Sequence, residues 1–273
     1  MTDAPGSKRD PDFIRRSRPV LERYASYFRP DVRGFEHLPG TGPFLVVGNH
    51  SGGQTPPDLP ILLTAWWRER GVEEPVYALF HSFFIGLPGV GPVVERAGAL
   101  EAGHGNAEAV MKDGGVVVVY PGGDHEAFRP WRDRNRIDFD GRDGFVRLAL
   151  RTGAPVVPAV SIGAHETLVV LSRGEAIARR LPYMRNWRIK TFPIVLGPPW
   201  GITIGMPTFP LPARVTVQLL APLRWAEEHG PQGAEDDKVV RRCYEEITSL
   251  MQGTLDQLAR ERRAPKQSRG PGE

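Results

Sequence analysis

Short apolar runs alternate along the chain with amphipathic stretches. The runs lie at residues 44–47, 76–79, 116–120, 156–162 and 215–220. Each has the length of a strand, and the third begins with four consecutive valines, whose β-branched side chains favour extended backbone. Because the runs are apolar throughout and do not alternate with polar residues, we expect strands that are buried on both faces.

Helical patterns separate these runs, at residues 58–70, 107–112 and 144–151, and two longer ones lie near the ends, at residues 12–28 and 239–262. Strands that are interleaved with helices are typical of an α/β fold. The pattern therefore predicts a single domain with a mixed, mostly parallel sheet flanked by helices.

The ends of the chain differ from its middle. Residues 1–10 and 264–273 are rich in Pro, Gly and charge, so we expect both to be disordered. Residues 11–31 form an amphipathic helix in this interpretation, bent at Pro19, and residues 32–263 form the main domain with the C-terminal helix. The N-terminal helix is either an ordinary one packed on the core or an interfacial one that sets arginines beside lipid phosphates.

Two stretches, residues 75–94 and 191–213, carry no charged side chain and are long enough to span a bilayer. Three prolines interrupt the first and six the second, and each proline removes a backbone donor. Neither stretch can satisfy its own backbone as one helix in lipid, so we expect no spanning segment. The polar start of the chain predicts no secretory signal.

Composition narrows the class of protein further. The 273 residues are 40% hydrophobic and 25% charged, which excludes a wholly disordered or coiled-coil chain. The net charge, 35 − 32 = +3, gives no indication of a nucleic-acid partner. A single cysteine, Cys243, excludes an internal disulfide framework and a Cys-rich metal site. It fits a reducing compartment, so we expect a cytoplasmic location.

The first candidate for chemistry is His50, which follows the strand at residues 44–47 in a Gly-rich loop. Asp58 stands where the next helix begins. A histidine oriented by a carboxylate is suited to take a proton from an alcohol. The alternative is a surface histidine and an aspartate that only caps a helix.

The second candidate segment, residues 120–129, also follows a strand. Its paired glycines, Gly122 and Gly123, expose backbone N–H groups to an anion or a developing oxyanion. Glu126 and Arg129 are candidates for binding a hydroxyl or a phosphate. The alternative is a tight turn with solvated charges.

Four segments in order resemble the phospholipid/glycerol acyltransferase family, the lysophosphatidate acyltransferase-like enzymes. They are residues 44–50, 89–98, 119–126 and 144–158, and the resemblance extends from about residue 32 to 223. Later motifs around residues 198–201 and 211–215 resemble the diacylglycerol acyltransferase-like branch. The resemblance implies a glycerol-phosphate acyltransferase-like fold, and a lipid hydroxyl acylated from acyl-CoA or acyl carrier protein as co-substrate. It also implies that His50 is the general base, that Asp58 orients it, and that no cofactor or metal is bound.

The chain departs from this family in three places. Seven residues separate His50 from Asp58, whereas the family usually has four. Gly122 stands where the family has Glu. The second block has Arg96 on its near side but lacks the following arginine that binds acceptor phosphate, a charge-assisted contact of roughly 1.5–3 kcal/mol. These departures favour a neutral or unusual lipid acceptor.

The sequence therefore predicts an O-acyltransferase, peripheral on the cytoplasmic face of a membrane. Its substrate-binding candidates are Gly122, Gly123, Glu126, Arg129 and Arg96, and its oxyanion candidates are Ser51, Gly122 and Gly123. The uncharged residues 83–94 and 192–209 would line an acyl groove or enter the bilayer surface, or else form core and connections.

Two other functions stay open at this point. One is a non-catalytic lipid-binding relative, in which the wider spacing of His50 and Asp58 has ended the chemistry. The other is a hydrolase of lipid esters or thioesters, which the lack of a Gly-x-Ser-x-Gly elbow disfavours. The acceptor, the acyl length, the acyl donor and the oligomeric state are left undetermined by the sequence.

Overall fold

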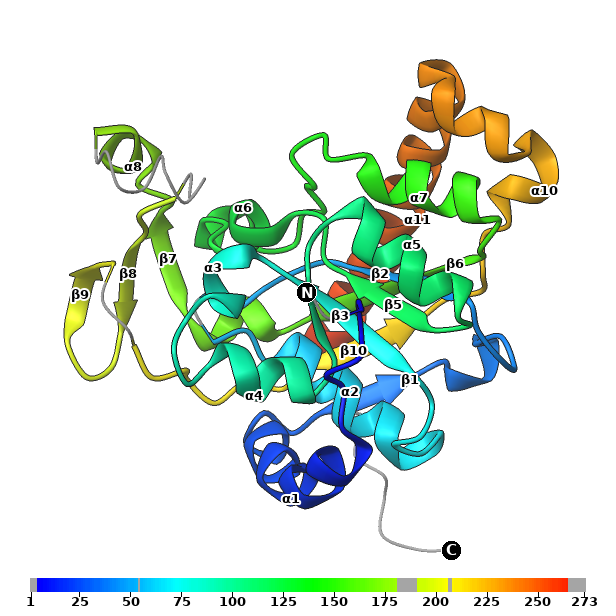
Figure 1. Ribbon diagram of the computed structural model, residues 1–273. Coiled ribbons are helices and arrows are strands. Elements are labelled where there is room, and N and C mark those ends of the chain that lie inside the picture. Colours follow the sequence, from blue (N-terminus) through cyan, green and yellow to red (C-terminus); the bar gives the residue numbers. More distant parts are fainter. Residues whose placement is uncertain (1–3, 54, 181–190, 206–207, 265–273) are drawn as a thin grey trace, which may run out of the picture.

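A seven-stranded sheet forms the centre of the protein (Figure 1). The computed structural model describes residues 4–53, 55–180, 191–205 and 208–264. The strands of this sheet are β1 (Asp31–Arg33), β2 (Phe44–Gly48), β3 (Val76–Phe80), β4 (Ala99–Glu101), β5 (Val116–Val119), β6 (Val156–Ile162) and β10 (Thr216–Leu219). Their order is β1-β10-β6-β2-β5-β3-β4, and only the β10–β6 pair is antiparallel. The predicted mixed, mostly parallel sheet is confirmed.

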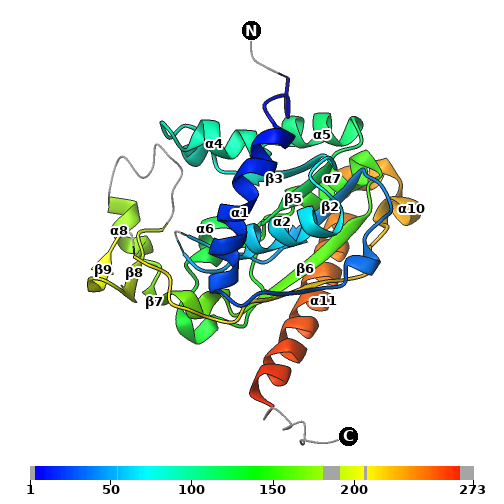
Figure 2. The same ribbon diagram turned by 90° about the horizontal axis from the view of Figure 1, so that it is seen from below.

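Helices cover both faces of this sheet (Figures 1 and 2). On one face lie α1 (Pro11–Tyr27) and α2 (Asp58–Glu69), which pack on Phe44 and Val46 of β2. On the other lie α5 (His104–Lys112), α7 (Gly144–Thr152) and α11 (Asp237–Arg263), which pack around Leu45 and Val47. Alternate residues of β2 thus enter two different cores, which is why its sequence is apolar throughout.

Shorter elements connect these layers. They are α3 (Ser82–Ile85), α4 (Gly91–Arg96), α6 (Gly123–Ala127), α8 (Glu175–Arg180), α10 (Trp225–His229), and the 3-10 turns η1 (Phe35–His37), η2 (Trp131–Asp133), η3 (Ala164–Thr167) and η4 (Pro231–Glu235). The uncharged stretch at residues 75–94 is divided between β3, α3 and α4. Among the residues that the structure describes, every helix is too short or too polar to cross a membrane.

A second, three-stranded sheet lies at one side of the domain, next to α6 (Figure 1). Its antiparallel strands are β7 (Val169–Ser172), β8 (Ile194–Gly197) and β9 (Gly201–Ile204). Val170 and Val195 on its inner face form a small core with Leu168 and with Phe128, which follows α6. The sequence analysis did not predict this sheet: β8 and β9 lie in the uncharged stretch at residues 192–209, for which we expected an acyl groove, a segment at the bilayer surface, or core and connections.

The N-terminal segment differs from the prediction of disorder through residue 10. The structure places residues 4–10 against the domain, where Lys8 pairs with Glu95 at 2.9 Å and Arg9 donates to the backbone carbonyls of Val72 and Glu74. The carboxylate of Asp10 caps α1, which runs through Pro19 as one helix. Residues 1–3 and 265–273, also predicted to be disordered, lie outside the described residues.

Candidate active site

His50 lies directly beyond the carboxyl end of β2, at the middle of the seven-stranded sheet. Tyr120 follows the adjacent strand β5, and its ring lies 4.7 Å from the imidazole, centroid to centroid. Parallel strands bring such residues together because their carboxyl ends meet at one edge, where α/β proteins place their sites. Sequence reasoning missed Tyr120 as a neighbour of His50.

His50 and Asp58 form a hydrogen-bonded pair. The imidazole Nδ1 lies 3.1 Å from Asp58 Oδ2, and the same oxygen accepts a hydrogen bond from the Ser51 backbone N–H at 2.8 Å. The Asp58 side chain is 1% exposed, whereas that of His50 is 18% exposed. With Nδ1 engaged by the carboxylate, Nε2 is the ring nitrogen that can exchange a proton with a bound substrate.

The loop between the two residues accounts for the wide spacing. Gly52 and Gly53 both have left-handed backbone, with φ of +100° and +69°, a conformation that glycine adopts without strain. The Gly53 N–H donates to the Ala127 carbonyl at 3.1 Å, so the loop is pinned to α6. The chain bulges at these glycines and returns to Asp58, the first residue of α2.

A buried ion pair supports the His50 backbone. Glu126 Oε2 accepts from the His50 N–H at 2.9 Å, and Glu126 Oε1 accepts from Arg129 Nη2 at 2.8 Å. The Glu126 and Arg129 side chains are 0% and 1% exposed. The Asp138 N–H also donates to Glu126 Oε1, and Arg129 Nη1 donates to the Arg136 carbonyl. Both residues were predicted to bind substrate directly, but the structure places them beneath the site rather than on its surface.

Burial and charge shift the pKa values of two groups here. Burial by itself would lower the pKa of His50, but the charge and hydrogen bond of Asp58, with the charge of Glu126, raise it above its usual value. Burial raises the pKa of Glu126 to about 7, because the Arg129 charge and the two backbone donors offset only part of the desolvation. Together, Asp58 and Glu126 thus make the His50 side chain a stronger base than a free imidazole.

Asn49 ties the strand ends together and was also missed by sequence reasoning. Its Nδ2 donates to the Ser161 carbonyl at 2.9 Å, and its Oδ1 accepts from the Ser161 N–H at 2.7 Å. This pair of bonds fixes the end of β2 to β6 one residue before His50. The sequence could have indicated this role, because Asn49 is a polar amide that directly follows a strand of buried residues.

The predicted oxyanion donors differ in what their N–H groups already bind. The Ser51 N–H donates to Asp58, and the Gly123 N–H donates to the Tyr120 carbonyl at 3.1 Å. For the Gly122 N–H, the described part of the chain provides no acceptor. Of the three candidates, Gly122 at the start of α6 is therefore the one with an N–H to offer.

Arg96 is not part of this cluster. It lies at the end of α4, where its guanidinium pairs with Asp10 Oδ2 at 2.6 Å and covers the Phe13 ring at 4.3 Å. These contacts hold the N-terminal segment, so the structure does not bring Arg96 to His50 as the substrate-binding prediction assumed.

His165 is a second histidine near the site that the sequence analysis did not single out. It lies in η3 with 5% exposure, and its Nε2 has no hydrogen-bond partner among the described residues. Burial lowers its pKa well below the usual value, helped by the positive charges of Arg129 and His50. The surroundings thus disfavour the protonated form of His165, whereas Asp58 favours that of His50.

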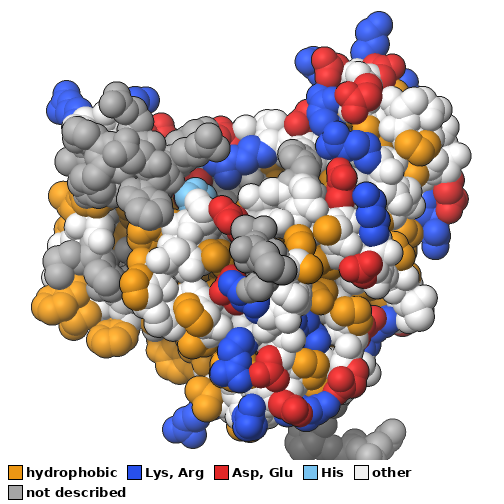
Figure 3. All heavy atoms as spheres, viewed as in Figure 1, with side chains coloured by type: hydrophobic (Ala, Val, Ile, Leu, Met, Phe, Trp, Pro, Cys, Tyr) orange, Lys and Arg blue, Asp and Glu red, His pale blue; other side chains and the backbone are white. Residues whose placement is uncertain are grey.

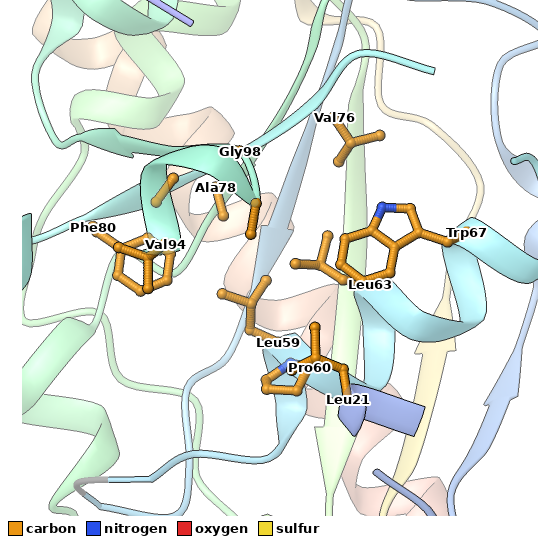
Figure 4. Close-up of a pocket in the computed structure, with 12 residues that line it drawn as sticks. Leu21, Leu59, Pro60, Leu63, Trp67, Val76, Ala78, Phe80, Val94 and Gly98 are labelled. Atoms are coloured by element: carbon orange, nitrogen blue, oxygen red, sulfur yellow. The ribbon is translucent and has the colours of Figure 1, made fainter. Parts of the chain in front are cut away.

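An apolar cavity of about 140 Å³ lies beside α2, and Figure 4 shows the side chains that line it. The lining comes from α1, α2, β3, α4 and β4, and includes Leu59, which directly follows Asp58. The other lining residues are Leu21, Pro60, Leu63, Trp67, Val76, Ala78, Phe80, Val94, Ala97, Gly98 and Ala99. Across the described ranges, no three His, Cys, Asp or Glu side chains gather as a metal site would require.

Residues 29–162 match the family model described as Acyltransferase. An uncharacterized protein of Mycobacterium tuberculosis is 31% identical over 249 residues, which is 90% of this chain and 66% of that protein. The chain thus spans about two thirds of the length of this relative. Phytyl ester synthase 2 of Arabidopsis thaliana is 28% identical over 161 residues, covering 57% of this chain and 22% of the synthase.

A similar fold occurs in the crystal structure of a 1-acyl-sn-glycerophosphate acyltransferase from Thermotoga maritima. The two structures superpose with a TM-score of 0.56 over 93% of this chain and 81% of that one, at 17% identity. The match confirms the predicted fold class, and the family model confirms the resemblance drawn from the four motifs.

Proposed function

The chain belongs to the acyltransferase family through residues 29–162, and from this premise we propose that it is an acyl-thioester-dependent O-acyltransferase acting at a membrane surface. One observation carries the proposal: the bulged loop brings Asp58 Oδ2 to 3.1 Å from His50 Nδ1 although seven residues separate them. The wider spacing was the reason to consider a non-catalytic relative, and this contact between the two side chains supports the catalytic alternative.

In the proposed reaction, His50 Nε2 takes the proton of a lipid hydroxyl as the oxygen attacks the thioester carbonyl of acyl-CoA or acyl carrier protein. A C–O bond forms, and the tetrahedral oxyanion accepts a hydrogen bond from the Gly122 N–H. When the C–S bond breaks, the thiolate receives the proton from His50. Asp58 holds the ring and stabilises its charged form, and Glu126 fixes the backbone of His50.

We propose a neutral lipid hydroxyl as the acceptor. The two arginines that the sequence analysis named as substrate-binding candidates are engaged, Arg96 with Asp10 and Arg129 with Glu126. Arg129 is also buried, so a phosphate could not reach it without breaking the pair. The name of the phytyl ester synthase, a partial relative, fits an acceptor that is an alcohol without phosphate.

We assign the cavity beside α2 to part of the acyl chain. Its lining is apolar, and Leu59 connects it to Asp58, so an acyl group seated there ends close to the catalytic pair. Cavities of roughly 150 Å³ lined by aliphatic and aromatic side chains stay dry and bind apolar groups. The bulk of a longer chain would extend beyond this cavity.

The test follows labelled acyl-CoA with the purified protein and detergent-dispersed acceptors: monoacylglycerol, diacylglycerol, a long-chain alcohol and lysophosphatidate. Wild type is compared with His50→Ala and with His37→Ala, whose histidine is exposed on η1. We expect label in a neutral lipid with wild type and with the control, but not with His50→Ala. Transfer only to lysophosphatidate would overturn the neutral acceptor. Free fatty acid as the sole His50-dependent product would favour a hydrolase.

A further inference from the structure

The outer face of the three-stranded sheet is apolar and exposed. In the hairpin of β8 and β9, Leu196 pairs directly with Ile202, and both side chains point away from the domain. Ile202 is 67% exposed. Other exposed apolar side chains of this region are Leu171, Trp200, Ile204 and Phe209. Figure 3 shows hydrophobic side chains gathered at this edge of the molecule.

The polarity of β9 is inverted relative to a strand of an ordinary half-buried sheet. Strands that face water on one side place apolar residues inward and polar residues outward. In β9 the outward positions are Ile202 and Ile204, whereas the inward position is Thr203, whose buried hydroxyl has no hydrogen-bond partner among the described residues. The pattern is that of a surface whose outer medium is apolar.

The charges beside this face point to an anionic partner. Apart from Glu175, the charged residues described in residues 169–205 are Arg173, Arg179 and Arg180, and the last two are exposed at the end of α8. Each basic residue near an anionic bilayer contributes about 1 kcal/mol of attraction. Trp200 lies exposed at the tip of the β8–β9 hairpin. Tryptophan side chains are enriched at the interface between lipid and water.

We infer that the outer face of β7–β9, together with Trp200 and Phe209, docks on the surface of an anionic bilayer. The inference deepens the proposed function, on which it rests, by naming the element that contacts the membrane. Arg173 Nε donates to the His125 carbonyl of α6 at 3.0 Å, and Leu168 packs against Phe128. The docked sheet therefore sits against α6, the helix that carries Glu126, whose carboxylate accepts from the His50 N–H, so the bilayer would lie on the side of the domain that holds this helix.

Vesicle binding tests the docking surface without any reliance on activity. The probe is phosphatidylcholine vesicles with and without phosphatidylglycerol, and binding is measured by cosedimentation. The double variant Ile202→Asp/Ile204→Asp changes only outward side chains, so it should fold. We expect its affinity for anionic vesicles to fall at least about tenfold, since two apolar side chains no longer enter the lipid. The matched control is Leu250→Asp, an exposed apolar residue on α11, and it should bind as wild type does.

A label reports insertion directly. Because Cys243 is buried, Ile202→Cys and Leu250→Cys each provide one accessible thiol for an environment-sensitive dye. Emission should shift to the blue on vesicle addition for the label at position 202 and stay unchanged at position 250. Equal binding of wild type and Ile202→Asp/Ile204→Asp, or no binding of wild type to either vesicle, would overturn the inference. A dimer without lipid that Ile202→Asp/Ile204→Asp converts to a monomer would assign this face to a second copy instead.

Discussion

The two sheets of this protein differ in what covers them. The seven-stranded sheet is buried on both faces, and Asn49, Glu126 and Asp58 fix the loop at its carboxyl edge through hydrogen bonds. The three-stranded sheet is covered on its inner face, while Leu196 and Ile202 remain exposed on the outer face. A sheet that is packed on both faces holds the side chains at its edge in fixed positions. A sheet that is packed on one face only leaves its apolar outer side chains free to contact a lipid bilayer. Under the two proposals made above, the seven-stranded sheet positions the reacting side chains and the three-stranded sheet provides the contact with the membrane.

The largest expected effect is a loss of stability when the buried Glu126–Arg129 pair is broken. Arg129→Met removes one partner of a buried ion pair and leaves Glu126 without its cation, so the free energy of unfolding should fall by about 3–5 kcal/mol. Urea unfolding above neutral pH measures it. Arg132→Met, at an exposed pair, should change stability by less than about 0.5 kcal/mol. A loss below about 1 kcal/mol for Arg129→Met would contradict the supporting role of the pair.

Asp58→Asn is expected to affect catalysis more than folding. It removes the charge that orients and stabilises the His50 imidazolium, so kcat/KM should fall on the order of 10²- to 10³-fold. The pKa of His50 is raised in the wild type, and protonated His50 cannot accept a proton, so activity is lost as pH falls through a midpoint above 6.5. In Asp58→Asn this midpoint should move to lower pH. Profiles with unchanged midpoints would argue against a direct coupling of the two residues.

The raised pKa of Glu126 should make the stability of the folded protein depend on pH. Its pKa is about 7 in the folded protein against an ordinary value of 4.5, so the folded state binds more protons between these values. Stability from this group is complete below 4.5 and is lost as pH rises through 7. The difference in unfolding free energy between wild type and Glu126→Gln should therefore decrease by about 1–3 kcal/mol across that window. A constant or rising difference would contradict the buried position of the carboxyl.

The smallest effect concerns the apolar cavity. Val94→Phe fills part of it and should shift the preferred acyl donor to a shorter chain, with about tenfold discrimination against the original length. Val93→Phe, at a neighbouring position that is 51% exposed, is the matched control. Competition between labelled acyl-CoAs of different length measures the preference. An equal shift in both variants would remove the cavity from the acyl site.

Much of the fold and the central pair could be predicted from the sequence. The five long apolar runs became strands, and His50 and Asp58 stand at a strand end and a helix start, where local pattern is informative. Asn49 binds Ser161, 112 residues away, and no local pattern reveals such a partner. The burial of Glu126 and Arg129 likewise depends on tertiary packing, and a local pattern could only mark them as charged.

The three-stranded sheet escaped prediction for a physical reason. A strand with one face in water usually places apolar residues inward and polar residues outward, but β9 places Ile202 and Ile204 outward and Thr203 inward. Prolines also interrupt the stretch around β8 and β9, which disfavours the interpretation of that stretch as strands. The same departure from the rule is what carries the inference about a lipid surface.

The most direct measurement compares acyl transfer by three proteins to one acceptor in two forms, embedded in anionic vesicles and dispersed in detergent. The account predicts that His50→Ala loses transfer to both forms, by about 10²- to 10⁴-fold, because the base is missing. Ile202→Asp/Ile204→Asp should lose transfer only to the vesicle form and match wild type in detergent. Full activity of His50→Ala would contradict the assignment of the base, and equal loss on both forms in Ile202→Asp/Ile204→Asp would contradict the separation of the two sheets.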